Sequence, residues 1–367
     1  MNNLQRLHAE FDQSPWIDFI DRQLVESGRL AVLVESGIRG LTSNPTIFAR
    51  AVASGQYDGL VRDAIQRGEP ARMIYQAIAV GDVRDAADVL REVYDASEGA
   101  DGYVSIEVEP DLAADSDGTL ARARELWTLV DRPNIFVKIP ATAAGLPAIS
   151  EAIAEGININ VTLMFGVEMY RRVAHAYLDG LRRRATEGWQ VDRVASVASF
   201  FVSRVDTKID RWLDEIGTDA ALAARGKAAV ANARMAYLAF GETFHGAHWH
   251  MLESAGARVQ RPLWASTSTK NPAYRDVLYV EELIGPHTVN TMPTDTISAF
   301  LDHGELRPTL EADPDAAVAT LAELAGLGID LERATDELLS EGVIAFAASF
   351  DELIAAIEAK RTTLAGA

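Results

Sequence analysis

The feature that most constrains the fold is a regular alternation of short apolar segments with longer amphipathic segments. The short segments have the length and residue pattern of buried β-strands, and the longer ones carry apolar residues three and four positions apart, as amphipathic helices do. Strand–helix alternation of this kind predicts a parallel sheet. The eight short segments are Pro15–Asp18, Ile38–Asn44, Tyr103–Pro110, Asn134–Ala141, Ile157–Phe165, Val194–Val202, Arg261–Thr267 and Thr288–Pro293.

Eight such units without an evident reversal predict an α/β fold, a closed (β/α)8 TIM barrel. The alternative is a doubly wound open sheet, but the glycine-rich nucleotide-binding motifs typical of that class are missing from the sequence. We expect residues 1–300 to form the catalytic barrel and residues 301–367 to add C-terminal helices packed on it within the same domain. An apolar stripe that includes Phe346, Phe350 and Leu353 predicts a helix capping the barrel.

Charge and cysteine content exclude several classes of function. The chain has 34 basic and 54 acidic residues, a net charge of −20, which argues against nucleic acid or an anionic membrane as the main partner. A local basic pocket would still allow an anionic small-molecule substrate. Cysteine is absent, which removes disulfides, thiolate metal sites and cysteine nucleophiles.

Apolar runs of the length that a membrane span or a secretory signal needs are also missing from the sequence. We therefore expect a cytoplasmic protein that acts without a nucleic acid or membrane partner, as a monomer or a homodimer.

Two of the strand segments carry polar residues at alternate positions. In Tyr103–Pro110 these include Glu107, and in Ile157–Phe165 they include Asn160 and Thr162. Alternate side chains of a strand point to opposite faces, and in a barrel the polar set points into the interior. Because barrel enzymes place their active sites at the carboxyl ends of the strands, we expect a site there. The alternative is a pair of edge strands in an ordinary sheet.

Lys138 is the residue with the most specific chemistry. It lies within Ile135–Ala141, the most apolar run in a chain that has only five lysines. A desolvated lysine amine is a nucleophile that forms Schiff bases with carbonyl compounds. The alternative is a lysine whose ammonium group reaches solvent from the end of a strand. Glu107, on the preceding strand segment, favours catalysis because a carboxyl group beside the amine can exchange protons with the reacting atoms.

Three other features carry weaker signals. Asp18 ends the first strand segment, where aspartate is commonly a helix N-cap. Asn44 precedes a proline and is typical of a turn. His245, His248 and His250 resemble a metal cluster, but helical spacing puts only the first two on one face, so we expect a solvated helix there, with no metal and no cofactor.

Taken together, the motifs resemble those of the transaldolase family, in its longer, actinobacterial-type branch. The resemblance extends from about Trp16 to Pro293, and the order of the motifs is that of the family. The segments that carry it are Gly40–Phe48, Ser105–Val108, Phe136–Thr142, Gly156–Leu163, Ser199–Arg204 and Pro262–Pro272.

The resemblance implies a Schiff-base enzyme of the non-oxidative pentose phosphate pathway. Such an enzyme transfers a dihydroxyacetone unit from sedoheptulose 7-phosphate to glyceraldehyde 3-phosphate, giving erythrose 4-phosphate and fructose 6-phosphate, without a metal or cofactor. By residue match, Lys138 is the Schiff-base lysine and Glu107 the carboxylate that works with a catalytic water. Thr162 is the residue that holds this water, and Asp18 is the acid/base of carbon–carbon cleavage, with Asp21 as a competing candidate.

The resemblance also implies which residues bind the phosphorylated sugar. Asn44 and Asn160 match hydrogen-bond partners of the dihydroxyacetone hydroxyls, and Thr42 lines the same turn as Asn44. Ser199, Arg204 and Ser266 match phosphate-binding positions.

The seventh strand segment departs from the family pattern. Where the family commonly has Ser-Phe-Arg, this chain continues from Ser266 as Ser-Thr-Ser-Thr to Lys270. Lys270 is either a replacement for the family arginine or a surface lysine in a turn, and both interpretations stay open.

Two other functions remain as alternatives. The similar fructose 6-phosphate aldolases generally have glutamine at the position of Glu107 and tyrosine at that of Phe201, so this chain favours transfer. A non-catalytic barrel that binds sugar phosphates is the other alternative, and loss of Lys138 chemistry would be its mark.

Overall fold

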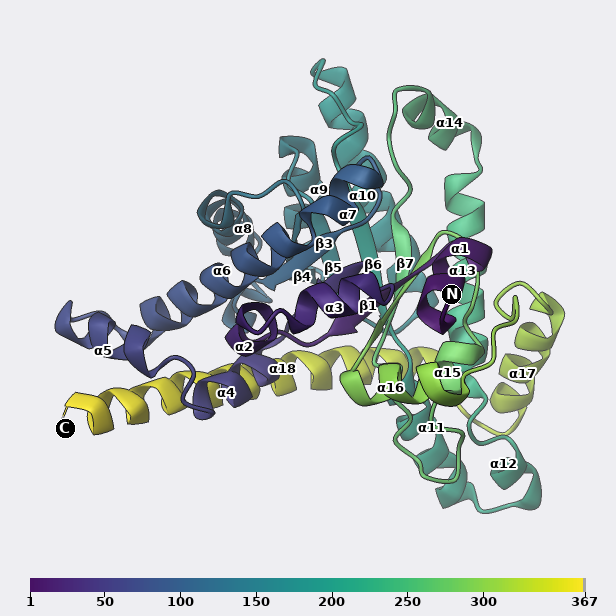
Figure 1. Ribbon diagram of the computed structural model, residues 1–367. Coiled ribbons are helices and arrows are strands. Elements are labelled where there is room, and N and C mark those ends of the chain that lie inside the picture. Colours follow the sequence, from purple (N-terminus) through teal and green to yellow (C-terminus); the bar gives the residue numbers. More distant parts are fainter. Residues whose placement is uncertain (366–367) are drawn as a thin grey trace.

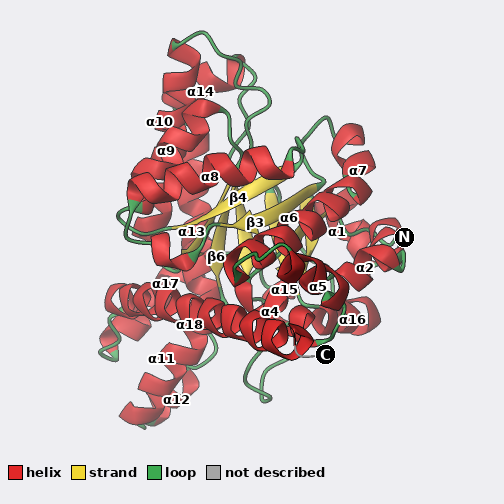
Figure 2. Ribbon diagram, turned by 90° about the vertical axis from the view of Figure 1, so that its left-hand side faces the viewer, coloured by secondary structure: helices red, strands yellow, loops and turns green. Residues whose placement is uncertain are grey.

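In a computed structural model, which describes residues 1–365, the chain forms a closed barrel of parallel strands in sequence order (Figures 1 and 2). The predicted α/β (β/α)8 TIM barrel is confirmed, and each expected segment overlaps one strand. The strands are β1 (Gln13–Asp18), β2 (Gly40–Thr42), β3 (Tyr103–Glu107), β4 (Ile135–Pro140), β5 (Ile159–Met164), β6 (Ser196–Phe201), β7 (Arg261–Ala265) and β8 (Thr288–Met292).

Helices surround the barrel and connect its strands. Most connections hold one main helix, but those after β2 and after β6 hold four each. The helices are α1 (Asn3–Phe11), α2 (Arg22–Glu26), α3 (Arg29–Glu35), α4 (Pro45–Ala53), α5 (Asp58–Gln66), α6 (Ala71–Val89), α7 (Arg91–Ala96), the 3₁₀ helix η1 (Pro110–Leu112), α8 (Ser116–Val130), α9 (Gly145–Glu155), α10 (Val167–Thr186), α11 (Ser203–Ile216), α12 (Asp219–Ala223), α13 (Ala228–Phe244), α14 (Ala247–Ser254), α15 (Leu278–Glu281), α16 (Thr294–His303), α17 (Pro314–Gly326) and α18 (Leu331–Ala365).

The strand register brings the polar residues at alternate positions of neighbouring strands next to one another. Glu107 of β3 is the register partner of Lys138 of β4, which in turn is the partner of Asn160 of β5. Ile106 and Val137, at intervening positions, are buried in the apolar core. Parallel partners point to the same face, so the polar set gathers inside the barrel.

A buried ionic cluster lies toward the amino-terminal end of the barrel. Asp101, 2% exposed, accepts hydrogen bonds from Ser14 and from Trp16 Nε1, the latter at 2.9 Å. Arg39 Nε lies 2.9 Å and Arg261 Nη2 3.5 Å from the same carboxylate. These contacts connect β1 and β7 to the segments before β2 and β3. They lie at the end of the barrel opposite the one where (β/α)8-barrel enzymes have their active sites.

The C-terminal region packs on this barrel. Residue 300, the expected boundary, falls within α16, and residues 366–367 of the expected C-terminal region lie outside the described residues. The long α18 contacts α4, α5, α6, α11, η1 and β5, and Figures 1 and 2 show it crossing beneath the strands. Within the described residues, the helices lack a segment with the length and apolarity needed to cross a membrane.

Candidate active site

A cavity of about 580 Å³ opens at the carboxyl ends of the strands. All the predicted site residues except Glu107 and Asn160 line it, and those two lie directly beneath, bonded to residues of the cavity wall. The predicted residues on the cavity wall are Asp18, Thr42, Asn44, Lys138, Thr162, Ser199, Arg204, Ser266 and Lys270.

The Lys138 amine lies at the floor of this cavity. The residue is 5% exposed, and its Nζ donates a hydrogen bond to the backbone oxygen of Ser43 at 2.9 Å. The Glu107 carboxylate is 3.4 Å from the same Nζ. Lys138 is thus held inside the barrel and does not extend to bulk solvent from the strand end. A buried primary amine that faces a cavity is placed to react with a carbonyl carbon.

Glu107 is a buried carboxyl group, 8% exposed. Burial raises the pKa of Glu107, because desolvation disfavours the charged form, while the positive charge of Lys138 acts in the opposite direction. A carboxyl whose pKa is raised toward neutrality exchanges protons more readily at physiological pH than an ordinary glutamate.

Asp18 ends β1 and faces the same cavity. Thr42 Oγ1 donates a hydrogen bond to Asp18 Oδ1 at 2.8 Å. The same Thr42 oxygen forms a second hydrogen bond with Thr291 Oγ1 at 2.7 Å. Burial raises the pKa of Asp18, and the charge of Lys138 opposes this shift. The helix-cap interpretation belongs instead to Asp21, whose Oδ1 accepts from Leu24 N at 2.6 Å at the start of α2. Asp21 is absent from the cavity wall, which leaves Asp18 as the acid/base candidate.

Asn160 belongs to a polar network under the cavity floor. Its Oδ1 accepts from Ser199 Oγ at 2.7 Å, and its Nδ2 donates to Ser105 Oγ at 3.1 Å. Asn44 begins a helix and does not form an isolated turn, and its role in substrate binding stays a prediction. Its Oδ1 accepts from Ile47 N at 3.1 Å and so caps α4, and the residue also lines the cavity.

Thr162 has an unusual environment. Its side chain is fully buried, yet its Oγ1 lacks a hydrogen-bond partner among the described residues. The strand is irregular at this point: its register with β6 shifts between Val161 and Met164, and Leu163 has a φ of 58°. Irregularities of this kind re-aim side chains near active sites. The result is a hydroxyl beside the cavity of Lys138 that no described residue engages.

Cations and hydroxyls gather on the β6 and β7 side of the cavity. The Arg204 guanidinium lies 5.2 Å from the ring centre of Phe201, and Lys270 Nζ donates to Ser268 Oγ at 2.6 Å. Lys270 is an exposed residue that also lines the cavity; partial desolvation lowers its pKa, and the charge of Arg204 adds to this effect. Ser266, with a φ of 57°, pairs with Ser203 Oγ at 2.9 Å at the start of α11. Two cations beside a helix N-terminus suit a phosphate group.

The cavity also contains residues that sequence reasoning missed. Arg50 adds a third cation, from α4, and Phe346 reaches the cavity from α18, far along the chain. The apolar stripe of α18 was visible in the sequence, but its position at the cavity was not. An exposed arginine in a helix has no signal that distinguishes it from the other surface arginines.

The histidine motif does not lie on one helix. His245 is the C-cap of α13, and α14 begins only after Gly246, so the expectation of one shared helix is wrong. The His248 side chain lies outside the described residues. Among the residues that the structure does describe, we find no group of three or more histidine, aspartate or glutamate side chains that could hold a metal ion.

Comparison with known proteins gives consistent matches over nearly the whole chain. The model of the family described as Transaldolase/Fructose-6-phosphate aldolase matches residues 15–357. The chain is 51% identical over 342 residues to a transaldolase of Thermobifida fusca, covering 92% of this chain and 93% of that protein. It is 52% identical to a transaldolase of Acidothermus cellulolyticus, covering 94% and 93%, and 49% identical to one of Mycolicibacterium smegmatis, covering 94% of each.

Proposed function

The chain belongs to the transaldolase/fructose-6-phosphate aldolase family, and on this basis we propose that it is a transaldolase. It transfers a dihydroxyacetone unit from sedoheptulose 7-phosphate to glyceraldehyde 3-phosphate. The products are erythrose 4-phosphate and fructose 6-phosphate. The observation that carries the proposal is the buried Lys138 amine, 3.4 Å from the Glu107 carboxylate at the floor of a cavity with cations on one side.

The reaction begins when the Lys138 amine adds to the keto carbon of the donor sugar. The resulting carbinolamine loses its hydroxyl as water, for which Glu107 supplies the proton, and an iminium forms. Thr162 holds the water that takes part in this step and in its reversal. Support for these roles comes from the raised pKa of Glu107 and from the Thr162 hydroxyl, for which the described part of the chain offers no hydrogen-bond partner.

Cleavage follows when the Asp18 carboxylate removes the proton from the C4 hydroxyl of the sugar. The C3–C4 bond breaks, its electron pair flows to the iminium nitrogen, and erythrose 4-phosphate leaves. Lys138 now carries a neutral enamine. Because the iminium is itself the electron sink, this step needs no metal ion to polarise the carbonyl group.

Transfer occurs when the enamine carbon attacks the aldehyde carbon of glyceraldehyde 3-phosphate. Asp18 returns its proton to the new hydroxyl, and the iminium forms again. Water then adds to the iminium, with Glu107 taking up a proton, and fructose 6-phosphate leaves the free Lys138 amine. One carboxyl group thus serves hydration and dehydration, and the other serves bond cleavage and formation.

Two sets of residues bind the substrate, and they meet at the cavity floor, where Ser199 donates a hydrogen bond to Asn160. Asn44, Thr42 and Asn160 bind the hydroxyls of the dihydroxyacetone unit. The phosphate group binds to the second set, which consists of hydroxyl and cationic side chains. These are Ser199, Arg204, Ser266 and Lys270. Support comes from the combined charge of Arg204 and Lys270, since guanidinium and ammonium groups both pair well with phosphate.

The family name also covers fructose 6-phosphate aldolases, which release free dihydroxyacetone. Glu107 and Phe201 differ from the glutamine and tyrosine typical of those relatives, and this favours transfer. We further propose that the enzyme acts in the cytoplasm, within the non-oxidative pentose phosphate pathway, as a monomer or a homodimer.

The proposal is tested by incubating the protein with sedoheptulose 7-phosphate and glyceraldehyde 3-phosphate and following both products. Lys138→Ala should abolish transfer and keep the fold, whereas Lys227→Ala, at an exposed lysine on the start of α13, should leave the rate unchanged. Turnover retained by Lys138→Ala would contradict the Schiff-base mechanism. Equal release of free dihydroxyacetone with and without the acceptor would favour the aldolase.

A further inference from the structure

The long C-terminal helix α18 is fixed across the mouth of the catalytic cavity. Near its start, Lys208 Nζ of α11 forms ion pairs with Glu337 at 2.8 Å and with Glu341 at 2.7 Å. Near its end, Lys360 forms an ion pair with Asp58 of α5. The two attachments lie on opposite sides of the barrel mouth, so the middle of the helix spans the opening (Figure 1).

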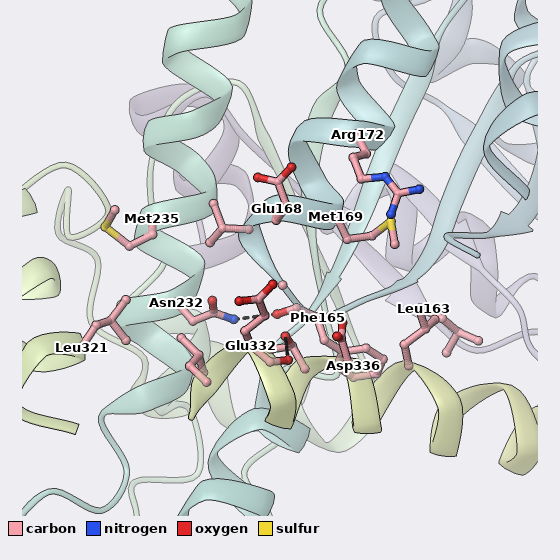
Figure 3. Close-up of a pocket in the computed structure, with 15 residues that line it drawn as sticks. Leu163, Phe165, Glu168, Met169, Arg172, Asn232, Met235, Leu321, Glu332 and Asp336 are labelled. Carbon is pink, nitrogen blue, oxygen red and sulfur yellow. Dashed lines mark hydrogen bonds between the residues drawn. The ribbon is translucent and has the colours of Figure 1, made fainter. Parts of the chain in front are cut away.

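The start and the middle of α18 pack against different parts of the molecule. Near its start, Leu331, Glu332, Thr335, Asp336 and Leu339 line a second cavity, of about 620 Å³, with residues of α10 and α13, and Glu332 and Asp336 point into it (Figure 3). The middle of the helix instead touches the barrel closely. A β-carbon on Gly342 would lie 3.1 Å from Leu163 Cδ2, at the end of β5. Farther along, the Phe350 ring meets Tyr75 edge-on at 5.3 Å between ring centres.

Phe346 lies one helical turn from each of these two close contacts, on the face of α18 that meets the barrel. It lines the catalytic cavity together with Lys138. Three residues after Phe346, the Ser349 hydroxyl accepts a hydrogen bond from Thr46 Oγ1 at 3.1 Å. Thr46 lies two residues after Asn44. One turn before Phe346, Gly342 packs on the neighbour of Thr162. Phe346 therefore covers the part of the cavity between Asn44 and Thr162, which it shares with Lys138, whereas Arg204 and Lys270 come from the β6 and β7 side.

This position matters because of the enamine intermediate. The enamine carbon has two fates. It can attack the acceptor aldehyde, which forms a carbon–carbon bond and completes the transfer. It can instead take up a proton from water, which gives the iminium of dihydroxyacetone. Addition of water then releases free dihydroxyacetone and the Lys138 amine. An apolar ring over the enamine slows the second fate, because it excludes water while the site waits for the acceptor.

We propose that Phe346 is a specificity-determining residue that sets the partition between transfer to the acceptor and release of free dihydroxyacetone. The inference rests on the proposed Schiff-base function and goes beyond it, because it assigns control of the reaction outcome to a side chain of the C-terminal helix. Arg204 and Lys270 hold the phosphate on the β6 and β7 side, so replacing Phe346 should change the partition more than the binding of the donor.

The test compares Phe346→Ala with Ile344→Ala, a control two residues away on the same helix whose side chain is 69% exposed. Each protein is given fructose 6-phosphate alone, and then with erythrose 4-phosphate as acceptor. We expect the ratio of dihydroxyacetone release to transfer to rise about tenfold in Phe346→Ala and to stay within about twofold of wild type in Ile344→Ala. In heavy water, the released dihydroxyacetone should carry deuterium at the carbon that was the enamine carbon.

A wild-type ratio in folded Phe346→Ala would overturn the inference. If the alanine variant fails to fold, Phe346→Leu, which keeps apolar volume but lacks the ring, takes its place: a raised ratio supports the inference and an unchanged one overturns it. Borohydride trapping separates this result from failure of the proposed function. Both proteins should give an adduct on Lys138, and its absence from wild type would instead refute the Schiff-base mechanism.

Discussion

Glu107 and Lys138 are register partners on neighbouring strands, and the carboxylate of the first lies 3.4 Å from the amine of the second. Both side chains are buried inside the barrel. A buried ion pair is a poor source of stability, because desolvation of the two charges offsets most of their attraction. The pair is better explained by chemistry, since a nucleophilic amine and a proton-exchanging carboxyl group are both needed at one carbonyl carbon.

Glu107→Gln keeps the size of the side chain and removes its ability to exchange a proton. We expect kcat for transfer to fall about a hundredfold, because general acid–base catalysis contributes at least this much. Steady-state kinetics measure the effect. The matched control is Glu109→Gln, two residues along, where the carboxylate pairs with Arg122 at 2.7 Å and is absent from the cavity wall. An unchanged kcat in Glu107→Gln would remove this residue from the proton transfers.

Arg204→Ala should weaken the binding of phosphorylated sugars. Loss of a hydrogen bond between a guanidinium and a phosphate costs about 2 kcal/mol, so KM should rise roughly thirtyfold. Unphosphorylated glyceraldehyde as acceptor should be affected little, and Arg211→Ala, at an exposed arginine of the same helix, serves as the control variant. Equal losses with phosphorylated and unphosphorylated acceptors would contradict the phosphate role.

Lys270→Met should shift the pH dependence of the reaction. The positive charge of Lys270 lowers the pKa of Asp18, opposing the upward shift that burial causes. Asp18 must be ionised to remove the hydroxyl proton, so activity falls as pH drops through its pKa. Without the lysine charge this pKa rises, and the acidic limb of the kcat/KM profile should move to higher pH. A limb that stays in place, or moves to lower pH, would show that Lys270 does not act on Asp18.

Asp101→Ala should destabilise the barrel without touching the site. The substitution leaves Arg39 and Arg261 without the carboxylate that they share, and breaking such a buried cluster costs about 3 kcal/mol. Urea denaturation measures the free energy of unfolding. Asp95→Ala, at a 58% exposed residue paired with Arg91, should cost less than about 1 kcal/mol. Equal effects of the two substitutions would show that the cluster contributes nothing beyond a surface pair.

The barrel could be predicted from the sequence because its strands carry a local signal. Tyr103–Glu107 and Ile159–Met164 alternate apolar and polar residues. In a barrel the apolar residues pack under the surrounding helices, and the polar residues point into the barrel interior. The chemistry of Lys138 was equally local, because a lysine within an apolar run demands an explanation. The pairing of Lys138 with Glu107 also followed, since consecutive strands of a βαβ unit lie side by side.

Other features depend on contacts that the sequence does not encode locally. Phe346 has the pattern of any helical core residue, and only the packing of α18 across the mouth brings it to the cavity. Asp101 has the sequence context of a loop residue. Its carboxylate nevertheless interacts with Ser14, Arg39 and Arg261, which come from three distant segments. Asn160 occupies one of the alternate positions that point into the barrel interior, but its hydrogen bonds to Ser105 and Ser199 lie beneath the cavity floor. Strand periodicity predicts which face a side chain is on, but not how far along the barrel axis it lies.

The most direct test of the Schiff-base mechanism is chemical trapping. The protein is incubated with fructose 6-phosphate, reduced with borohydride, digested and mapped by mass spectrometry. We expect one modified peptide, Ile135–Ala141 or a fragment containing it, with a sugar- or dihydroxyacetone-derived adduct on Lys138. Folded, active protein that carries no adduct there, or carries it on another lysine, would contradict the central claim.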